Sequence, residues 1–220
     1  MIIIQPYIEI LPQLLKGANT TIQILIASAL VTYSVAFIAG LGKISRFKLV
    51  RGVTTFYVEI FRGTSLLVQM FWIFYALPAF GITLSPFLAG VITLGLNYGA
   101  YASEVVRGAI QAIPKGQTEA AIALNMSRWH RMTRVILPQA IRIMLPGFGN
   151  ISIELLKGTS LVSLITLADL TFQGLIIRNT NLSYTFHVFI SLLVIYFLIA
   201  LPLIILVRKL ENRAAKGVAK

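Results

Sequence analysis

The sequence contains no cysteine, and only 7 of its 220 residues are Asp or Glu. Without cysteine the chain cannot form disulfides, use a thiol nucleophile or bind a metal through thiolates. It also lacks a G-x-x-x-x-G-K-[ST] phosphate-binding loop, so it cannot bind and hydrolyse ATP by that route. No paired catalytic carboxylates, histidine cluster or Ser–His arrangement stands in a coherent context. We therefore expect no catalytic site, no metal site and no cofactor in this chain.

Charged residues are scarce, and hydrophobic residues are abundant. Only 12% of the residues are charged, compared with about 25% in ordinary soluble domains. Hydrophobic residues make up 57%, and the mean hydropathy is +0.85. A water-soluble fold of this length could not bury so much apolar surface around one core. The first ten residues, MIIIQPYIEI, lack the basic region of a cleaved signal peptide. The composition therefore predicts a protein embedded in a lipid bilayer.

Long runs without charge predict where the chain crosses the bilayer, because a spanning helix needs roughly 20 mostly apolar residues. The run 63–103 is too long for one helix, and its prolines and glycine at 78–86 predict two helices joined by a short turn. The run 145–169 is a weaker candidate, since Glu154 and Lys157 interrupt it. We predict an all-α membrane protein with five transmembrane helices, one in residues 17–42, two in 63–103, one in 145–169 and one in 179–207.

The positions of the 19 Lys and Arg residues orient the predicted spans. Although the net charge is +12, the bases avoid the apolar runs and do not alternate with aromatic residues, so we expect no nucleic-acid partner. Positive loops stay in the cytoplasm, which predicts an external N-terminus and a cytoplasmic C-terminus. The bases assigned to the cytoplasmic face are Lys43, Arg46, Lys48, Arg51, Arg107, Lys115, Arg128, Arg131, Arg134, Arg142, Arg208, Lys209, Arg213, Lys216 and Lys220, whereas only Lys16 and Arg178 are assigned to the outer face.

Three parts of the chain follow from this topology. Residues 1–16 are predicted to be an external segment, either a short interfacial helix or a plain apolar leader. Residues 17–210 are predicted to form the transmembrane domain, and residues 211–220 a cytoplasmic tail.

The most informative segment lies on the predicted cytoplasmic side and covers residues 113–140. Its sequence predicts a helix that begins at Glu119 and is capped by Thr118. Ser127 is predicted to cap a second short helix that ends at the Leu-Pro pair before residue 139. Two alanines after Glu119 give the first helix a smooth face, and a tryptophan among bases is expected to be exposed. This combination indicates a docking site for a soluble partner.

The segment resembles the EAA coupling loop of ABC importer permeases, whose helix pair inserts into a groove of a separate ATPase subunit. The family pattern has Glu-Ala-Ala, three residues, a glycine and a downstream Ile/Leu-Pro. Asn125 replaces the glycine here, and Asn tolerates the left-handed conformation better than most residues. The resemblance implies that ABC ATPase subunits bind this loop and that they, not this chain, bind ATP. The coupling residues implied are Glu119, Ala120, Ala121, Asn125, Ser127, Trp129, Leu137 and Pro138.

Further segments resemble the polar amino-acid branch of that family. FYVEIFRGTSLLVQ at 56–69 resembles its FRGTPLLVQ signature, with Ser65 in place of proline, and LLKGTSL at 155–161 resembles its LKxTSL segment. Together with YASEVVRG at 101–108, the resemblance covers residues 18–210 in order. It implies a multi-pass permease of the bacterial inner membrane for a polar amino acid or related solute, such as an opine or an ectoine-like compound. Its implied partners are a second permease subunit (the same chain or a related one) and an external solute-binding protein.

Polar residues inside the predicted spans are candidates for the solute route, because they are costly in lipid. Glu59, Glu104 and Glu154 each have a base three residues later. Each therefore either pairs on its own helix or, for Glu104 and Glu154, faces a shared cavity. Amides near mid-bilayer either bond across helices or line the route. We predict that the route is bordered by Ser65, Gln69, Asn97, Tyr101, Glu104 and Glu154. The alternative hypothesis is a stand-alone membrane enzyme that uses Glu104 and Glu154.

Overall fold

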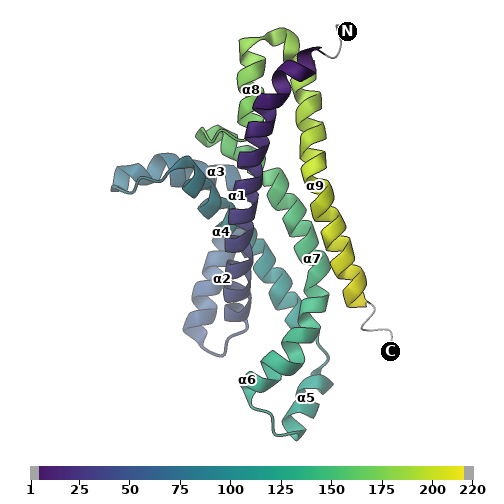
Figure 1. The fold of residues 1–220 in the computed structure, drawn as a ribbon. Helices are drawn as coiled ribbons and strands as arrows, with labels where there is room; N and C mark the ends of the chain where they lie inside the picture. Colours follow the sequence, from purple (N-terminus) through teal and green to yellow (C-terminus); the bar gives the residue numbers. More distant parts are fainter. Residues whose placement is uncertain (1–4, 216–220) are drawn as a thin grey trace.

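A computed structural model of the chain describes residues 5–215, and this part contains helices and no strand (Figure 1). The predicted all-α class is therefore confirmed. Its α-helices are α1 (Gln5–Lys43), α2 (Lys48–Gly63), α3 (Leu66–Phe71), α4 (Pro86–Gln111), α5 (Lys115–Ala123), α6 (Arg128–Arg131), α7 (Leu137–Gly158), α8 (Leu170–Thr180) and α9 (Thr185–Ala215). Short π-helical or 3-10 segments lie between them: η1 (Trp72–Ala76), η2 (Leu77–Phe80), η3 (Met132–Ile136), η4 (Thr159–Ile165) and η5 (Leu182–Tyr184).

The first helix is longer than the predicted span. α1 has 39 residues, and it continues without a break through residues 5–16, where the sequence predicts a separate external segment; residues 1–4 lie outside the described residues. Ile10 of α1 packs there with Leu170 of α8 and Val188 of α9. Gly17 allows the close approach of α8, because a Cβ at that position would lie 2.7 Å from the carbonyl oxygen of Asp169.

α4 lies at the centre of the packing, against α1, α2 and α7. Gly95 and Gly99 form a small-residue stripe that admits α1, since a Cβ on either glycine would meet Val31 or Val35 at less than 3 Å. This agrees with the sequence pattern, in which glycines four residues apart favour close helix approach in membranes. On another side of α4, Val106 belongs to a buried apolar cluster with Met144 of α7.

The spans differ in part from the predicted five. Two helices are long and apolar enough to cross a bilayer alone, Pro6–Lys43 and Leu182–Arg213, and up to four spans result if each of two bent helix pairs crosses once. The region 63–103 contains the expected pair of helices and short turn, with Gly81 in the left-handed conformation. However, α2 and the segment 66–80 meet at 105°, and together they form one bent unit. A count of five therefore also requires α4, whose 26 residues extend about 39 Å.

The two ends of the molecule carry different elements. Figure 1 shows the N-terminus and the far end of α8 together at one end, and α5 and α6 projecting at the other. α9 runs from the first end toward the second and continues as a helix to Ala215; residues 216–220 of the predicted tail lie outside the described residues. The segment 113–140 is thus held well away from the N-terminus.

Candidate functional site

The break between α2 and α3 exposes backbone carbonyl groups that amide side chains satisfy. Thr64 and Ser65 have extended backbones, so the helical hydrogen bonds stop at residue 63. The Phe61 carbonyl oxygen accepts hydrogen bonds from Gln69 Nε2 and Asn97 Nδ2, both at 3.0 Å. Gln69 Nε2 also donates to the hydroxyl and the carbonyl of Thr64. A broken helix is tolerated in a membrane only where such partners replace the lost bonds.

Gln69 and Asn97 also contact each other, with Asn97 Nδ2 donating to Gln69 Oε1 at 3.0 Å. The sequence leaves open whether these amides bond across helices or line a route. In the structure they bond across helices, joining α3 to α4, and Asn97 is only 4% exposed. Ser65, by contrast, is exposed at the break itself.

Arg62 is a residue that the sequence reasoning did not assign to the site. Its guanidinium lies 5.3 Å from the ring centroid of Tyr101, whose hydroxyl donates to the Arg62 carbonyl oxygen at 3.3 Å. The i,i+3 spacing predicts a pair between Arg62 and Glu59, but Glu59 instead lies 3.8 Å from Lys43 Nζ. Arg62 is exposed and has no ion pair among the described residues. The signal that could have identified it is its place directly before the Gly-Thr-Ser break.

Glu154 of α7 resembles Arg62 in having no ion pair among the described residues. Its side chain is exposed on α7, and within the described part of the chain it has no ion pair with Lys157. Tyr98 of α4 interacts electrostatically with both Glu154 and Tyr101. The Tyr98 side chain lies against Gly158, one turn beyond Glu154, where any Cβ would collide with its hydroxyl. An exposed base therefore lies over Tyr101, and an exposed acid interacts with Tyr98, about one turn away on α4.

Glu104 lies in a different environment from Glu154. It pairs with Lys43 Nζ of α1 at 2.6 Å and with Arg107 Nη2 of its own helix at 2.7 Å. Arg107 in turn donates to Gln111 Oε1 at 2.7 Å. The i,i+3 partner of Glu104 was expected, whereas Lys43 was not. The contact with Lys43 joins the end of α1 to α4. The Glu104 carboxylate is therefore already neutralised.

The first helix of the segment 113–140 is short, as expected, whereas the second, α6, continues through η3 into α7. Asn125 has φ +53°, the left-handed conformation predicted from its position. Ser127 caps α6 by accepting a hydrogen bond from the backbone N–H of His130 at 3.3 Å. Thr118 does not cap, because α5 begins three residues earlier at Lys115, directly after Pro114. The cap prediction for Thr118 was wrong because the fixed φ of proline already starts the helix.

The outward surface of this segment is apolar at its tip. Trp129 is 72% exposed and Leu124 is 76% exposed. Glu119 and Ala120 are also exposed, whereas Ala121 is buried against the second half of the segment. Only one of the paired alanines can therefore contact a partner.

The sequence predicts that a helix ends at the Leu137–Pro138 pair. In the structure no helix ends there. The chain instead changes helix type there, from the π-helical η3 to α7. Proline has no N–H to donate, and the backbone accommodates this through the wider π turn that precedes it. Gln139 Nε2 donates to Gln117 Oε1 at 3.1 Å and so ties α7 to α5.

At the opposite end of the molecule, a hydrogen bond joins the start of α1 to η5, directly before α9. The Tyr184 hydroxyl donates to Glu9 Oε2 at 2.6 Å. Among the described residues there is no group of three or more His, Cys, Asp and Glu side chains that could hold a metal ion.

Comparison with known proteins gives consistent matches over nearly the full chain. Residues 10–216 match the family model described as "Binding-protein-dependent transport system inner membrane component". The probable amino-acid ABC transporter permease protein y4tF of Sinorhizobium fredii is 48% identical over 91% of this chain and 87% of its own. The L-cystine permease protein TcyB of Bacillus subtilis is 41% identical over 95% and 89%. The glutamine permease protein GlnP of Escherichia coli is 38% identical over 92% and 93%.

Solved structures show the same fold. A chain of an amino acid ABC transporter crystallised with histidines has a TM-score of 0.87 and 36% identity, covering 94% of this chain and 96% of that one. A chain of the MetNI methionine ABC transporter in an inward-facing conformation has a TM-score of 0.76 over 96% and 98% of the two chains. At 19% identity, this second likeness concerns the fold alone.

Proposed function

Because the chain belongs to the family of binding-protein-dependent transport system inner membrane components and is the permease subunit of an amino-acid ABC importer, we propose that its solute passes the break between α2 and α3. The solute is a polar amino acid or a related zwitterion. Ser65, Gln69, Asn97, Tyr101 and Glu154 border its route, and Glu104 marks the cytoplasmic end.

The observation that supports this proposal most is that an exposed base and an exposed acid each interact with one of two α4 tyrosines about a helical turn apart. A zwitterion needs a base for its carboxylate and an acid for its ammonium group. Arg62 offers a planar guanidinium beside Tyr101, which suits bidentate binding of a carboxylate. Glu154 offers a carboxylate beside Tyr98. Unpaired charges at membrane depth are costly, and a bound solute compensates both at once.

Transport by this chain depends on a separate ATPase that docks on residues 113–140. Members of this family work with ATPase and solute-binding partners. The exposed tip around Trp129 and Leu124 supports docking, and the contact of Gln139 with Gln117 supports transmission to α7. The ATPase favours one conformation only to the extent that it binds the two conformations differently. We expect a second permease subunit, the same chain or a related one, to complete the pathway.

The alternative, a stand-alone enzyme using Glu104 and Glu154, finds no support in these contacts. Glu104 is held between Lys43 and Arg107, so it is not available as an acid or base. The relatives that match the chain over most of its length are named as permeases.

The zwitterion site is tested by removing the charge that should bind the carboxylate. The complete transporter is reconstituted in liposomes, and uptake of labelled glutamine, cystine and histidine identifies a transported amino acid. The free amino acid and its carboxamide then compete with uptake. In the wild type the amino acid should compete at least tenfold better than the amide, because only it offers a carboxylate to Arg62.

In Arg62→Gln this preference should fall to near unity, with weaker uptake. Arg51→Gln on α2, which removes an exposed base away from the break, is the matched control and should retain the preference. A full preference in Arg62→Gln would exclude Arg62 as the carboxylate ligand.

A further inference from the structure

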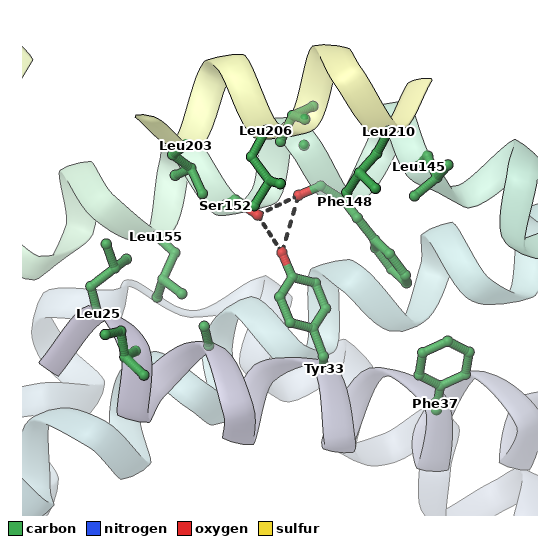
Figure 2. Close-up of a pocket in the computed structure, with 14 residues that line it drawn as sticks. Leu25, Tyr33, Phe37, Leu145, Phe148, Ser152, Leu155, Leu203, Leu206 and Leu210 are labelled. Carbon is green, nitrogen blue, oxygen red and sulfur yellow. Dashed lines mark hydrogen bonds between the residues drawn. The ribbon is translucent and has the colours of Figure 1, made fainter. Parts of the chain in front are cut away.

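A second concave site lies between α1, α7 and α9, apart from the proposed solute route. It has a volume of about 400 Å³, and none of the six proposed route residues lines it. Figure 2 shows leucines of α9 pointing toward α1, with Tyr33 and Phe148 between the helices. Its walls include Leu25 and Phe37 of α1, Leu145 and Leu155 of α7, and Leu203 and Leu210 of α9.

The cavity has the length of one bilayer leaflet. Along α1 it extends from Leu25 to Phe37, which is about 18 Å at the α-helical rise. Half of the hydrocarbon core of a bilayer measures about 15 Å. Toward the N-terminal end the cavity opens into a larger groove of about 900 Å³ between α1 and α9, with which it shares Leu25 and Leu203. A long, flexible apolar chain fits this shape better than a compact solute does.

The polar groups in the wall are already satisfied. The Tyr33 hydroxyl has one proton to donate, and both the Phe148 carbonyl oxygen, at 3.2 Å, and the Ser152 hydroxyl oxygen lie within reach of it, as the dashed lines in Figure 2 show. Ser152 Oγ donates to the same carbonyl at 2.8 Å. Because these groups bond to one another, they need no partner in the cavity. An amino acid would leave its charges unpaired there, whereas a hydrocarbon chain would not.

One mouth of the cavity is basic. Phe37, Leu145 and Leu210 lie at the same end in Figure 2. Arg142 is three residues before Leu145 on α7, and Arg213 is three residues after Leu210 on α9, so each continues the lining face by one helical turn. Both side chains are exposed. The two arginines therefore flank the point at which a chain leaving the cavity would reach the membrane surface.

We propose that this cavity is a binding site for an anionic phospholipid, with one acyl chain between α1, α7 and α9 and the phosphate on Arg142 and Arg213. Basic residues at the membrane surface between helices attract anionic head groups, and a guanidinium binds phosphate oxygens in bidentate geometry. A second copy of the chain fits less well, because a two-fold axis through the groove would bring like-charged mouths together. The acyl chain fills space between α7 and α9, so the lipid stabilises the packing of these two helices against each other.

The test uses the complete purified transporter and native mass spectrometry. Dioleoyl phosphatidylglycerol and dioleoyl phosphatidylcholine are titrated separately, so that only the head group differs. Each surface base contributes roughly fivefold to the binding of an anionic lipid, so two bases should favour phosphatidylglycerol by roughly 30-fold. Arg213→Gln should reduce phosphatidylglycerol binding roughly fivefold and phosphatidylcholine binding by less, because the cationic choline group offsets the charge of the phosphate. The same charge change in Arg51→Gln on α2 is the control and should have no effect.

The cavity itself is tested by filling it. Ala29 lines the cavity, so Ala29→Phe should lower retention of phosphatidylglycerol severalfold. Leu30→Phe, on the exposed neighbouring face of α1 and not part of the lining, should not. Equal binding of the two lipids would mean that lipid binds without selectivity for the head group, and it would overturn the proposal. So would unchanged selectivity in Arg142→Gln/Arg213→Gln, or a cross-link from Ala29→Cys to a second permease chain.

Discussion

The three glutamates that precede a base by three residues lie in three different environments. Glu59 has a side chain that is 68% exposed and only a distant partner, Lys43 Nζ at 3.8 Å. Glu104 is 19% exposed and has two close bases. Glu154 is exposed and interacts with Tyr98. Within the described residues it has no basic partner, close or distant. The same local spacing therefore leads to different roles, since Lys43 comes from α1 and reaches only the first two. Glu154 is the acid that remains available to a solute.

The role of Glu154 can be separated from a structural pair by a double-mutant cycle. If Glu154 served only to neutralise Lys157, Glu154→Gln with Lys157→Met would restore much of the transport lost in either single variant. We expect instead that the double variant stays inactive or prefers solutes without a cationic group, because the ammonium ligand is gone. Uptake of labelled amino acids into liposomes measures this. Recovery with unchanged selectivity would remove Glu154 from the site.

Lys43 should matter for stability. Lys43→Met leaves Glu104 with Arg107 alone in a partly buried position, so we expect a loss of roughly 1–3 kcal/mol, between exposed and buried ion pairs. Thermal unfolding of the purified transporter in detergent should show a lower Tm. Lys48→Met, at the exposed start of α2 and outside the network, is the matched control. An equal Tm in Lys43→Met and the wild type would mean that the network adds no stability.

At the scale of elements, two helix interruptions position the functional segments. The break at residues 64–65 ends α2, and side chains from α3 and α4 satisfy its carbonyl groups. The turn at residues 124–127 reverses the chain between α5 and α6. The break and the turn are stabilised by different kinds of contact. The first depends on long-range contacts, such as the bond from Asn97 to Phe61, whereas the second depends on local chemistry at Asn125 and Ser127.

The turn between α5 and α6 should therefore respond to backbone preference. Asn125→Gly should leave coupling intact, because glycine adopts positive φ without strain. Asn125→Val should destabilise the turn with positive φ at residue 125 by about 1–2 kcal/mol, since a branched Cβ disfavours the left-handed conformation. We expect docking to require this turn. Solute-stimulated ATP hydrolysis by the reconstituted complex should fall severalfold in the valine variant only. Equal stimulation in both would show that docking does not depend on this turn.

At the scale of the whole molecule, the fold separates two ends along the long axes of α1 and α9. The contact between Glu9 and Tyr184 lies at one end, and the exposed tip with Trp129 lies at the other (Figure 1). An importer needs this separation, because solute delivery and ATP hydrolysis occur on opposite faces of the membrane. The distribution of bases favours the cytoplasm for the end with α5 and α6.

Orientation can be measured directly because the chain has no cysteine. Single cysteines are introduced at Asn179, exposed near the end of α8, and at Gly116, where an added Cβ meets no atom within 4 Å. A membrane-impermeant maleimide added to whole cells, after permeabilisation of any outer membrane, should label Asn179→Cys and spare Gly116→Cys. Both should react after lysis of the cytoplasmic membrane. The reverse pattern would place the N-terminus in the cytoplasm.

Properties that depend on local composition and backbone preference could be predicted from the amino-acid sequence. Apolar runs predict the all-α class, and the left-handed turn at Asn125, the Ser127 cap and the Gly95/Gly99 stripe follow from the residues present. Local reasoning failed at Thr118, where Pro114 starts the helix earlier, and at Pro138, where a π turn absorbs the missing N–H.

Only the tertiary structure decided which charges remain unpaired. Whether Glu104 meets Lys43, or Arg62 meets Tyr101, depends on contacts between helices far apart in the chain. The 105° bend after α2 likewise depends on amides of α3 and α4. In lipid each polar group must find a partner inside the protein, and hydropathy cannot say which one. The choice among partners is therefore made when the helices pack, because packing fixes the distances that determine an electrostatic interaction.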